Sequence, residues 1–312
     1  MDISVIVCTY NRSEITRKML ESMESLIAPQ GLTWEILIID NSTDNTKEVV
    51  QGFVDRGRLP LIYMFTAIKN RSMALNRGIK AAKGEILIFI DSDMELDRGY
   101  LLAVIAAVKS YPDINVFGGR VLIKWPFPKP SWVIADGPYQ NIDSVSAIYD
   151  HGDHDKDYLE MHSIPSLGNI FLRKNIFENN LFREDLGPRD GKMGYGEDTE
   201  FFSRLKNKGE MMYYIKAALT YHNVEAHKIS KKYFLQRKYE MGQYDVKFRS
   251  LLGSTIYYFG VPRYLFRKAI KNMFLWIFSI NSHKRFFYRL RLWYILGEIT
   301  GYAKSKCDNP VI

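Results

Sequence analysis

The sequence predicts an α/β fold with a mostly parallel, doubly wound sheet, and three observations lead to this prediction. Short β-branched runs alternate with helix-forming segments through the first 110 residues, as in βαβ units with right-handed crossovers. The run Ile86–Ile90 is apolar throughout, which is typical of a central strand buried on both faces. Polar residues follow these runs, and in such sheets the ligand binds beyond the carboxyl ends of the strands.

The expected elements follow one another in a regular order at first. In this part we expect strands at residues 3–8, 34–39, 61–65 and 86–90 and helices at residues 13–26, 45–55, 72–83 and 98–110. A further strand is expected at 115–123, before an irregular segment at 125–165. We then expect a strand at 166–173, a helix that begins near Glu197, and extended backbone at 211–221.

The irregular segment 125–165 contains four prolines between residues 126 and 138, followed by the polar loop 151–157. A stretch of this length in a compact domain is usually a functional loop or a mobile lid. The polar loop holds two histidines and three aspartates, so a metal cluster is one interpretation. The lack of cysteine and of helical ligand spacing favours a solvated loop instead.

Composition sets further limits on the class of protein. The chain has 312 residues, 46% hydrophobic and 25% charged, which suffices for a sizeable core in one or two domains. Its two cysteines, Cys8 and Cys307, exclude a disulfide framework and favour a reducing compartment. We recognise neither a signal peptide nor an apolar run of transmembrane length.

Charge is unevenly distributed along the chain. Residues 228–312 carry 17 basic and 4 acidic side chains, whereas residues 1–227 carry 26 basic and 31 acidic ones. Apolar and aromatic residues follow helical spacing at 263–280 and 284–302, opposite lysines and arginines. Such basic amphipathic helices are typical of in-plane anchors on an anionic membrane.

A helical hairpin that packs on the rest of the chain is the alternative interpretation of this tail. Nucleic acid is not an expected partner, because residues 1–227 are acidic and contain no recognisable nucleic-acid-binding module.

Two carboxylates, Asp91 and Asp93, directly follow the buried strand. At the carboxyl end of a strand they suit Mg²⁺ or Mn²⁺ held together with substrate phosphates. A solvated turn explains Asp-Ser-Asp alone equally well. Glu197 and Asp198 fall in the first turn of a predicted helix, where the macrodipole stabilises anions. His222 follows a strand, where a structural histidine is the commoner explanation.

Five stretches of the chain resemble, in order, the motifs of family 2 glycosyltransferases of GT-A fold. They are Val5–Arg12, Ile38–Asp44, Ala74–Ile79, Ile90–Asp93 and Gly196–Phe201. The last two resemble the D-x-D and G-E-D-x-E-F/D motifs, and the resemblance extends over about residues 3–227. Two departures concern the donor: Asn41 stands where an aspartate is usual, and Leu75 replaces an arginine. The second departure leaves Arg71 to supply positive charge.

The resemblance implies roles for individual residues. The donor-binding residues would be Thr9, Tyr10, Arg12, Asp40, Arg71, Asn76, Asp91 and Ser92. Asp93 and His222 would hold Mn²⁺ or Mg²⁺ against the diphosphate, and Asp198 would be the general base. The acceptor-binding residues would be Glu197, Gly168 and Asn169.

The implied protein is an inverting, metal-dependent glycosyltransferase of the hexosyltransferase type (EC 2.4) in polysaccharide biosynthesis. It would move a sugar from a nucleotide sugar, with a UDP-sugar favoured, to a glycan or lipid-linked acceptor. Residues 1–227 would be the catalytic domain, with 1–110 binding the nucleotide and 111–227 the acceptor. Residues 228–312 would attach it peripherally to the cytoplasmic, inner face of the cell membrane. A sugar-phosphate nucleotidyltransferase and an inactive membrane-associated binding module are the alternatives.

Overall fold

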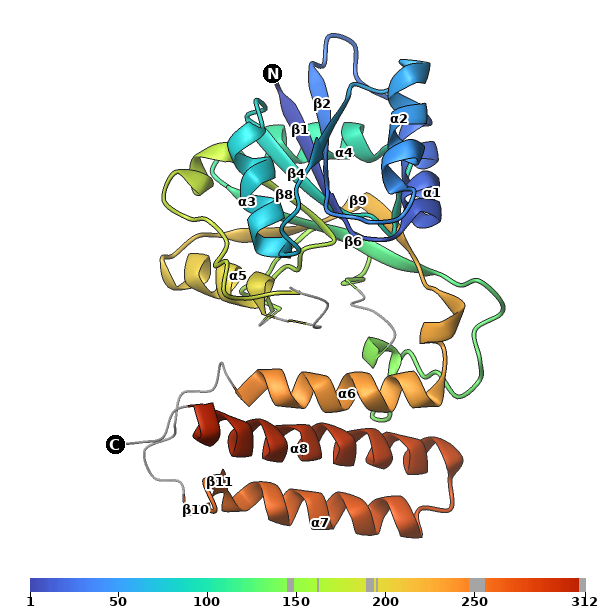
Figure 1. Cartoon of the computed structure of the whole chain (residues 1–312), viewed down its shortest axis with the longest axis vertical. Coiled ribbons are helices and arrows are strands. Elements are labelled where there is room, and N and C mark those ends of the chain that lie inside the picture. Colours follow the sequence, from blue (N-terminus) through green and yellow to red (C-terminus); the bar gives the residue numbers. More distant parts are fainter. Residues whose placement is uncertain (145–148, 162, 189–193, 195, 247–255, 309–312) are drawn as a thin grey trace. The chain divides into compact units, whose positions relative to one another are not determined.

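The computed structural model describes residues 1–144, 149–161, 163–188, 194, 196–246 and 256–308, with only the backbone described at 305–308. The chain divides into two compact units (Figure 1). The first, which we call the sheet unit, comprises residues 1–124 and 148–223. The second, the helical unit, comprises residues 125–147 and 224–312.

The sheet unit is built on one nine-stranded sheet of order β3-β2-β1-β4-β8-β6-β9-β5 in the described residues, with β7 paired to β9. The strands are β1 (Ile3–Thr9), β2 (Trp34–Asp40), β3 (Leu61–Phe65), β4 (Ile86–Asp91), β5 (Met94–Leu96), β6 (Val116–Lys124), β7 (Lys156–Asp157), β8 (Asn169–Arg173) and β9 (Met212–Asn223). β1 to β4 run parallel, whereas β8 is antiparallel to both β4 and β6. The predicted α/β fold with a mostly parallel sheet is confirmed.

Helices cover both faces of this sheet, with α1, α2 and α4 on one face and α3 and α5 on the other. Their bounds are α1 (Ser13–Glu24), α2 (Thr46–Arg56), α3 (Arg71–Ala81), α4 (Tyr100–Ser110) and α5 (Glu197–Asn207). The central strand β4 contributes to both cores, because successive side chains point to opposite faces. Ile88 lies in the core under α1, α2 and α4, and Phe89 lies in the core under α3 and α5.

The register of the parallel strands brings their carboxyl ends to one edge. Thr9 lies opposite Asp40 across β1 and β2, and β4 ends beside them at Asp91. The short strand β5, which the sequence did not predict, follows β4 at once and pairs with β9. This pairing places Met94 opposite His222, so β9 contributes to the same edge.

The helical unit contains α6 (Lys231–Asp245), α7 (Arg263–Phe278) and α8 (Ser282–Asp308), and α8 lies between the other two (Figure 1). Two short strands, β10 (Tyr257–Tyr258) and β11 (Val261–Pro262), precede α7. Glycines allow α6 and α8 to approach closely, since a Cβ atom on Gly297 would lie 2.0 Å from the carbonyl oxygen of Tyr239. Two of these helices match the predicted helical stretches, whereas α6 was not predicted as a separate helix.

The segment 125–147 packs with these helices although more than 70 residues separate it from them. The ring centroid of Trp132 lies 5.0 Å from that of Phe234 and 5.5 Å from that of Phe286. Lys238 Nζ also lies 2.5 Å from a carboxylate oxygen of Asp143. The helical unit therefore consists of more than a C-terminal tail.

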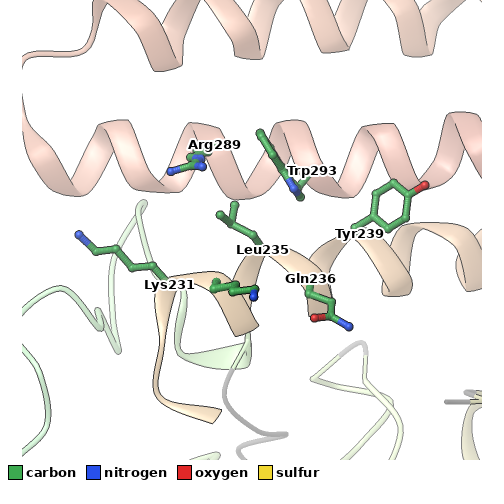
Figure 2. A pocket seen from close by; sticks show the side chains of 7 residues that line it. Lys231, Leu235, Gln236, Tyr239, Arg289 and Trp293 are labelled. Atoms are coloured by element: carbon green, nitrogen blue, oxygen red, sulfur yellow. The ribbon is translucent and has the colours of Figure 1, made fainter. Parts of the chain in front are cut away.

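A groove of about 550 Å³ lies in the helical unit between α6 and α8 (Figure 2). Its lining residues are Lys231, Lys232, Leu235, Gln236, Tyr239, Arg289 and Trp293. Arg289 lies 5.2 Å from the ring centroid of Trp293, so a cation–π contact orders part of the wall. In the described part of the chain, no helix combines the length and hydropathy required to cross a membrane.

Candidate active site

Asp40, the last residue of β2, is 1% exposed and both of its carboxylate oxygens accept hydrogen bonds. The Ser42 amide donates to Oδ1 at 2.8 Å, and the Tyr63 hydroxyl donates to Oδ2 at 2.8 Å. Burial raises the pKa of Tyr63 well above its ordinary value, and the hydrogen bond to Asp40 and the charge of Asp40 raise it further. Tyr63 therefore remains a donor, and Asp40 fixes the loop that follows its strand.

The loop after β1 is tied to the loop after β2. Asn11 has a left-handed backbone, with φ +51°, which asparagine tolerates better than most residues. Its amide donates to Ser42 Oγ at 2.8 Å, and its side-chain oxygen accepts from the Thr43 amide at 2.7 Å. This turn leaves the ring of Tyr10 39% exposed at the edge of the sheet.

The carboxylate of Asp93 has two basic neighbours. Its Oδ2 lies 2.9 Å from Arg12 Nη1 and 3.3 Å from His222 Nε2. The Asp93 and His222 side chains are each 8% exposed, so they meet in a largely desolvated place. The three residues come from separate parts of the sequence and are brought together by the loop after β1 and by the β5–β9 pairing.

Asp93 and His222 have the chemistry of a site for Mn²⁺ or Mg²⁺. Carboxylate oxygens suit both ions, and Nε2 of His222 lies beside the Asp93 carboxylate. No set of three or more His, Cys, Asp or Glu side chains in the described ranges is arranged to hold a metal alone. Two protein ligands would leave positions for phosphate oxygens, which is the usual arrangement of Mg²⁺ in phosphate-binding sites. The residues present fit a metal that is shared with a diphosphate.

Arg71, the first residue of α3, joins two groups of acids. Its guanidinium forms an ion pair with Asp91 and lies 3.5 Å from a carboxylate oxygen of Glu197. Burial raises the pKa of Asp91, while the charge of Arg71 lowers it and the charge of Asp93 raises it. Burial also raises the pKa of Glu197 to about 7, and Arg71 opposes that rise. Glu197 therefore exchanges a proton near neutral pH.

Asp198 lies in the first turn of α5, next to Glu197. Ser166 Oγ donates to its Oδ2 at 2.8 Å, and the Thr199 amide donates to its Oδ1 at 2.7 Å. Gly196 precedes the helix with φ +95°, a conformation that allows the chain to turn into α5. The helix macrodipole stabilises acids at this position whether or not they react.

Three of the predicted site residues use their polar atoms within the framework. The Thr9 hydroxyl is buried against α1. Asn76 holds the backbone of Phe182 through both ends of its amide, at 2.9 Å each. Asn169 Oδ1 accepts from the Tyr100 hydroxyl at 2.7 Å, and its amide nitrogen donates to two carbonyl oxygens.

Other predicted residues lie at the edge itself. The Gly168 carbonyl accepts from the Asp91 amide at 3.4 Å, and Ser92 is 2% exposed. The ionisable side chains that the fold brings together are Arg12, Arg71, Asp91, Asp93, Glu197, Asp198 and His222. Sequence reasoning missed Ser166, whose partner Asp198 lies 32 residues further along the chain and leaves no local pattern.

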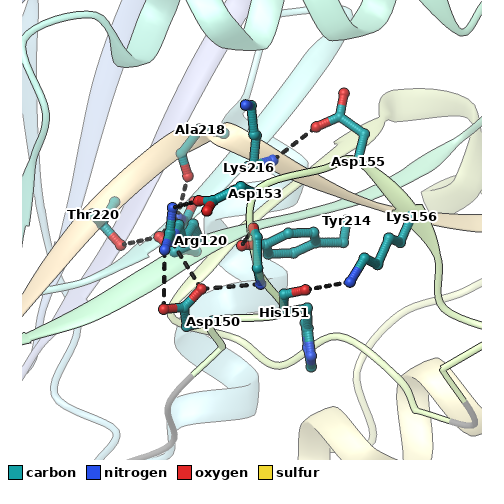
Figure 3. A network of polar contacts seen from close by, with 12 residues as sticks. Arg120, Asp150, His151, Asp153, Asp155, Lys156, Tyr214, Lys216, Ala218 and Thr220 are labelled. Carbon is teal, nitrogen blue, oxygen red and sulfur yellow. Dashed lines mark hydrogen bonds and ion pairs between the residues drawn. The ribbon is translucent and has the colours of Figure 1, made fainter.

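The polar loop 151–157 is pinned to β6 by charge pairs (Figure 3). Arg120 of β6 lies 2.9 Å from carboxylate oxygens of both Asp150 and Asp153. Lys156 donates to the His151 carbonyl oxygen at 2.6 Å. Asp150, directly before this loop, and Asp153 within it thus serve as partners of Arg120.

Residues 4–179 match the family described as glycosyl transferase family 2, and they make up more than half of the chain. The chain belongs to this family. The resemblance that the sequence motifs indicated is confirmed. The matched region includes Arg12, Arg71 and Asp93 but ends before Asp198.

Several proteins are similar to this chain over part of their length. Glycosyltransferase AglE of Haloferax volcanii is 25% identical over 208 residues, which are 66% of this chain and 62% of that protein. Dolichol-phosphate mannosyltransferase of Pyrococcus furiosus is 32% identical over 133 residues, 41% of this chain and 37% of that protein. Succinoglycan biosynthesis protein ExoM of Rhizobium meliloti is 22% identical over 246 residues, 78% of this chain and 74% of that protein. The chain thus spans less than two thirds of the first two relatives.

Two solved structures share the fold. Mannosyltransferase PcManGT from Pyrobaculum calidifontis, in complex with GDP-Man and Mn²⁺, matches with a TM-score of 0.53 and 15% identity over 99% of this chain and 76% of that one. S. aureus TarS 1–349 in complex with UDP matches with a TM-score of 0.51 and 15% identity over 99% of this chain and 92% of that one. At such low identity these matches establish the fold alone, and the predicted GT-A fold is confirmed.

We expect Glu197→Gln to weaken the pH dependence of folding stability. Folding raises the pKa of Glu197 from 4.5 to about 7, so its contribution to the free energy of unfolding falls as the pH rises through this interval. The fall is on the order of 3 kcal/mol, and the glutamine variant lacks it. Urea unfolding below and above the interval measures the difference.

Glu14→Gln, at an exposed side chain of α1, provides the matched control and should keep the wild-type pH dependence. An unchanged pH dependence in Glu197→Gln would contradict the prediction and would mean that Arg71 fully offsets the burial of this acid.

Proposed function

We propose that the chain is an inverting glycosyltransferase that moves a sugar from a nucleoside diphosphate sugar to a hydroxyl group of a glycan or lipid-linked acceptor. The observation that carries this proposal is the arrangement of acids at one edge of the sheet. Asp93 and His222 form a pair suited to a metal, and Asp198 is held by hydrogen bonds beside Glu197. Arg71 lies between the two groups through its ion pairs with Asp91 and Glu197.

In the proposed reaction Asp198 acts as the general base. Its carboxylate takes the proton of the acceptor hydroxyl while that oxygen attacks the anomeric carbon from the face opposite the leaving group. The new carbon–oxygen bond forms as the bond to the diphosphate breaks, and the nucleoside diphosphate leaves with the electron pair. This single displacement inverts the anomeric carbon. The hydrogen bonds from Ser166 and the Thr199 amide fix the carboxylate for that task.

The donor is proposed to lie along the strand ends. Arg12 and Arg71 supply positive charge for the diphosphate, and the exposed ring of Tyr10 is available for stacking on the base. Asp93 and His222 would hold Mn²⁺ or Mg²⁺, which neutralises charge on the leaving diphosphate when it is bound. A UDP-sugar is the first donor to test, in line with the UDP in the TarS structure, and GDP-mannose is the second.

We propose that the remaining predicted residues hold the donor and acceptor sites in shape. Thr9, Asp40 and Ser92 shape the donor edge, and Asn76 fixes the backbone at Phe182. On the acceptor side, Glu197 offers its carboxylate to an acceptor hydroxyl, while Gly168 and Asn169 keep the chain beside Asp91 in place.

We expect Asp198→Asn to lower kcat for sugar transfer by about 10²–10⁴-fold, because the amide cannot accept the proton. Metal-dependent donor binding should persist, since Asp198 lies outside the Asp93–His222 pair. Release of nucleoside diphosphate and calorimetric titration of the donor measure the two properties. Glu200→Gln on the same helix, which removes a partner of Arg204, should leave kcat within a few-fold of wild type.

Loss of donor binding in Asp198→Asn would place this residue in the donor site instead. Release of pyrophosphate by the wild-type protein would favour a sugar-phosphate nucleotidyltransferase over the proposed function.

We expect Asp93→Ala to weaken Mn²⁺ binding and Mn²⁺-dependent donor binding together, each by about 10–100-fold. The substitution removes the carboxylate that both Arg12 and His222 contact. Titration of donor with and without Mn²⁺ separates the metal effect from a general loss of affinity. Asp113→Ala, at an exposed acid, is the control. Retained Mn²⁺-dependent binding in Asp93→Ala would remove this residue from the proposed metal site.

We also propose that the helical unit attaches the protein to the inner face of the cell membrane. The outward side of α7 supports this, because Ile270 and Phe274 are each 53% exposed and Phe278 is 73% exposed. Exposed basic residues flank them on the same helix: Arg267, Lys268 and Lys271. An apolar stripe with a basic border is suited to an anionic lipid surface.

The exposed stripe is only part of the apolar spacing predicted for residues 263–280. Ile270 and Phe274 lie on it, whereas Leu265, which follows the same spacing, is buried in the core of the helical unit. α7 therefore has an apolar side that packs on α8 and a second apolar side that is exposed. The periodicity of apolar residues in the sequence did not distinguish the buried side of α7 from its exposed side.

We expect the double substitution Phe274→Asp and Phe278→Asp to reduce binding to phosphatidylglycerol-containing vesicles by at least about tenfold. Each buried phenylalanine side chain is worth about 1.5–3 kcal/mol, and each aspartate also repels anionic lipid. Vesicle co-sedimentation measures the change, with Leu102→Asp at an exposed leucine of α4 as the control. Equal sedimentation of the two variants would contradict the proposal.

Point substitutions are preferable to a truncation near Ser230 for this test. Trp132 packs on Phe234 and Phe286, so a truncated chain would expose an aromatic patch that the intact protein covers.

A further inference from the structure

The groove in the helical unit forms where α6 and α8 separate (Figure 2). Further along both helices glycines allow close contact, since a Cβ atom on Gly242 would lie 2.1 Å from the carbonyl oxygen of Tyr294. Before the glycines of each helix, Leu235 and Trp293 line the space between the helices. These large side chains keep the helices apart and leave a groove of about 550 Å³ that is lined by the helical unit alone.

Three of the seven residues that line the groove are cations, and none is an acid. The cations are Lys231, Lys232 and Arg289, and none of them forms an ion pair within the described part of the chain. Lys238 on the same helix, by contrast, lies 2.5 Å from a carboxylate oxygen of Asp143. The groove therefore concentrates positive charge that the described residues leave without a counter-charge.

The two lysines lie where the electrostatics of a helix disfavour cations. Lys231 and Lys232 are the first two residues of α6, and no acid occurs in its first turn. The positive end of the helix macrodipole repels them, so this pair lowers the stability of the helix. An anion beside the same turn would be attracted by the macrodipole, by the first amide groups of the helix and by both lysines.

Aromatic rings hold two of the cations in place. The guanidinium carbon of Arg289 lies 5.2 Å from the ring centroid of Trp293 and 5.3 Å from that of Trp276. Lys231 Nζ lies 5.4 Å from the ring centroid of Phe286. Arg289 Nε is also buried without a hydrogen-bond partner among the described residues, so its charge lacks the compensation that a desolvated cation needs. The rings preorganise the charges, which lowers the entropy cost of binding an anion.

The rest of the groove wall is largely apolar or aromatic. Figure 2 shows Lys231 and Arg289 toward one end and Tyr239 toward the other, with Leu235 and Trp293 between them. Leu235 is buried, and tyrosine and tryptophan combine an apolar ring with a polar tip. A ligand that fills the groove would therefore contact cations at one end and apolar surface along the remainder.

We propose that the groove binds a phosphate or diphosphate group that carries a single apolar chain, as in a prenyl-type lipid. Three cations without acidic partners match a phosphomonoester or a diphosphate better than a phosphodiester, which has a single negative charge. One row of apolar side chains between two helices accommodates one chain. The groove is lined by α6 and α8 and is distinct from the exposed stripe of α7.

The proposal goes beyond the proposed function, because it concerns binding in the helical unit and requires no sugar transfer. Combined with the proposed function, on which this one step rests, it favours a lipid-linked acceptor over a free glycan. The charge and the chain of the ligand can both be tested separately from catalysis.

The test is calorimetric titration of the full chain with farnesyl diphosphate, without donor and in the presence of EDTA. Inorganic diphosphate, which lacks the chain, and farnesol, which lacks the charge, should each bind at least about tenfold more weakly. The double substitution Lys231→Gln and Lys232→Gln should weaken the binding of farnesyl diphosphate by about 10–100-fold, because it removes two charged donors from the groove.

Lys268→Gln together with Lys271→Gln is the matched control, because it removes the same charge from exposed positions of α7 outside the groove. Its affinity for farnesyl diphosphate should stay within about twofold of wild type. All four lysines are exposed, so both double variants should fold, and circular dichroism checks that they do.

Two results of the titrations would overturn the proposal. One is the absence of farnesyl diphosphate binding, or equally strong binding of inorganic diphosphate. The other is an equal loss of affinity in the two double variants, which would indicate a general effect of charge.

Vesicles that contain phosphatidic acid, tested in parallel, distinguish a second source of the same headgroup chemistry. If the wild-type protein binds these vesicles but not farnesyl diphosphate, and the Lys231 and Lys232 substitutions abolish vesicle binding, the groove serves a two-chain phospholipid and the proposal is wrong. Because the titrations contain neither donor nor metal, such a failure leaves the proposed glycosyltransferase function standing, and Asp198→Asn tests that function on its own.

Discussion

One cation makes the acidic site possible. Asp91, Glu197 and Asp198 converge at the edge of the sheet, and all three charges act on the guanidinium of Arg71. Without that guanidinium, several carboxylates would face one another in a largely desolvated place, which costs far more than an exposed pair gains. Its location depends on the start of α3, where Asn70 caps the helix through a 3.0 Å bond from the Met73 amide. The Asn70 cap therefore helps to place Arg71, and Arg71 in turn stabilises the acids around it.

The sequence predicted the acids better than it predicted their partners. Asp93 and Asp198 were singled out by the resemblance to the D-x-D and G-E-D-x-E-F/D motifs, since a strand end and a first helical turn are also ordinary places for acids without a role. Ser166 and Arg71 contact residues 32 and 126 positions further along the chain, and such pairs depend on the paths of intervening loops. Asn76 shows the same limit, because its motif indicated a donor residue while its amide holds the backbone at Phe182.

The fold was predictable to the extent that local patterns carry it. The spacing of apolar residues predicts the alternation of strands and helices, and the first four strands lie close to their expected positions. The association of residues 125–147 with the helical unit could not be predicted from such local patterns. The prolines indicate an irregular path, but they do not indicate which side chains Trp132 contacts. In α7 the periodicity revealed a helix, but only the packing of α8 decides that Leu265 is buried and Phe274 is exposed.

The composition of the helical unit from two separated stretches has a consequence for synthesis. Residues 125–147 leave the ribosome long before the helices on which they pack. At ~5–20 residues per second, Trp132 precedes Phe286 by roughly 8–30 s. Over that interval the nascent chain presents an aromatic, proline-rich segment without its partners, while residues 1–124 are already available to begin folding. The rate of elongation and the chaperones at the ribosome therefore bear directly on the yield of this protein.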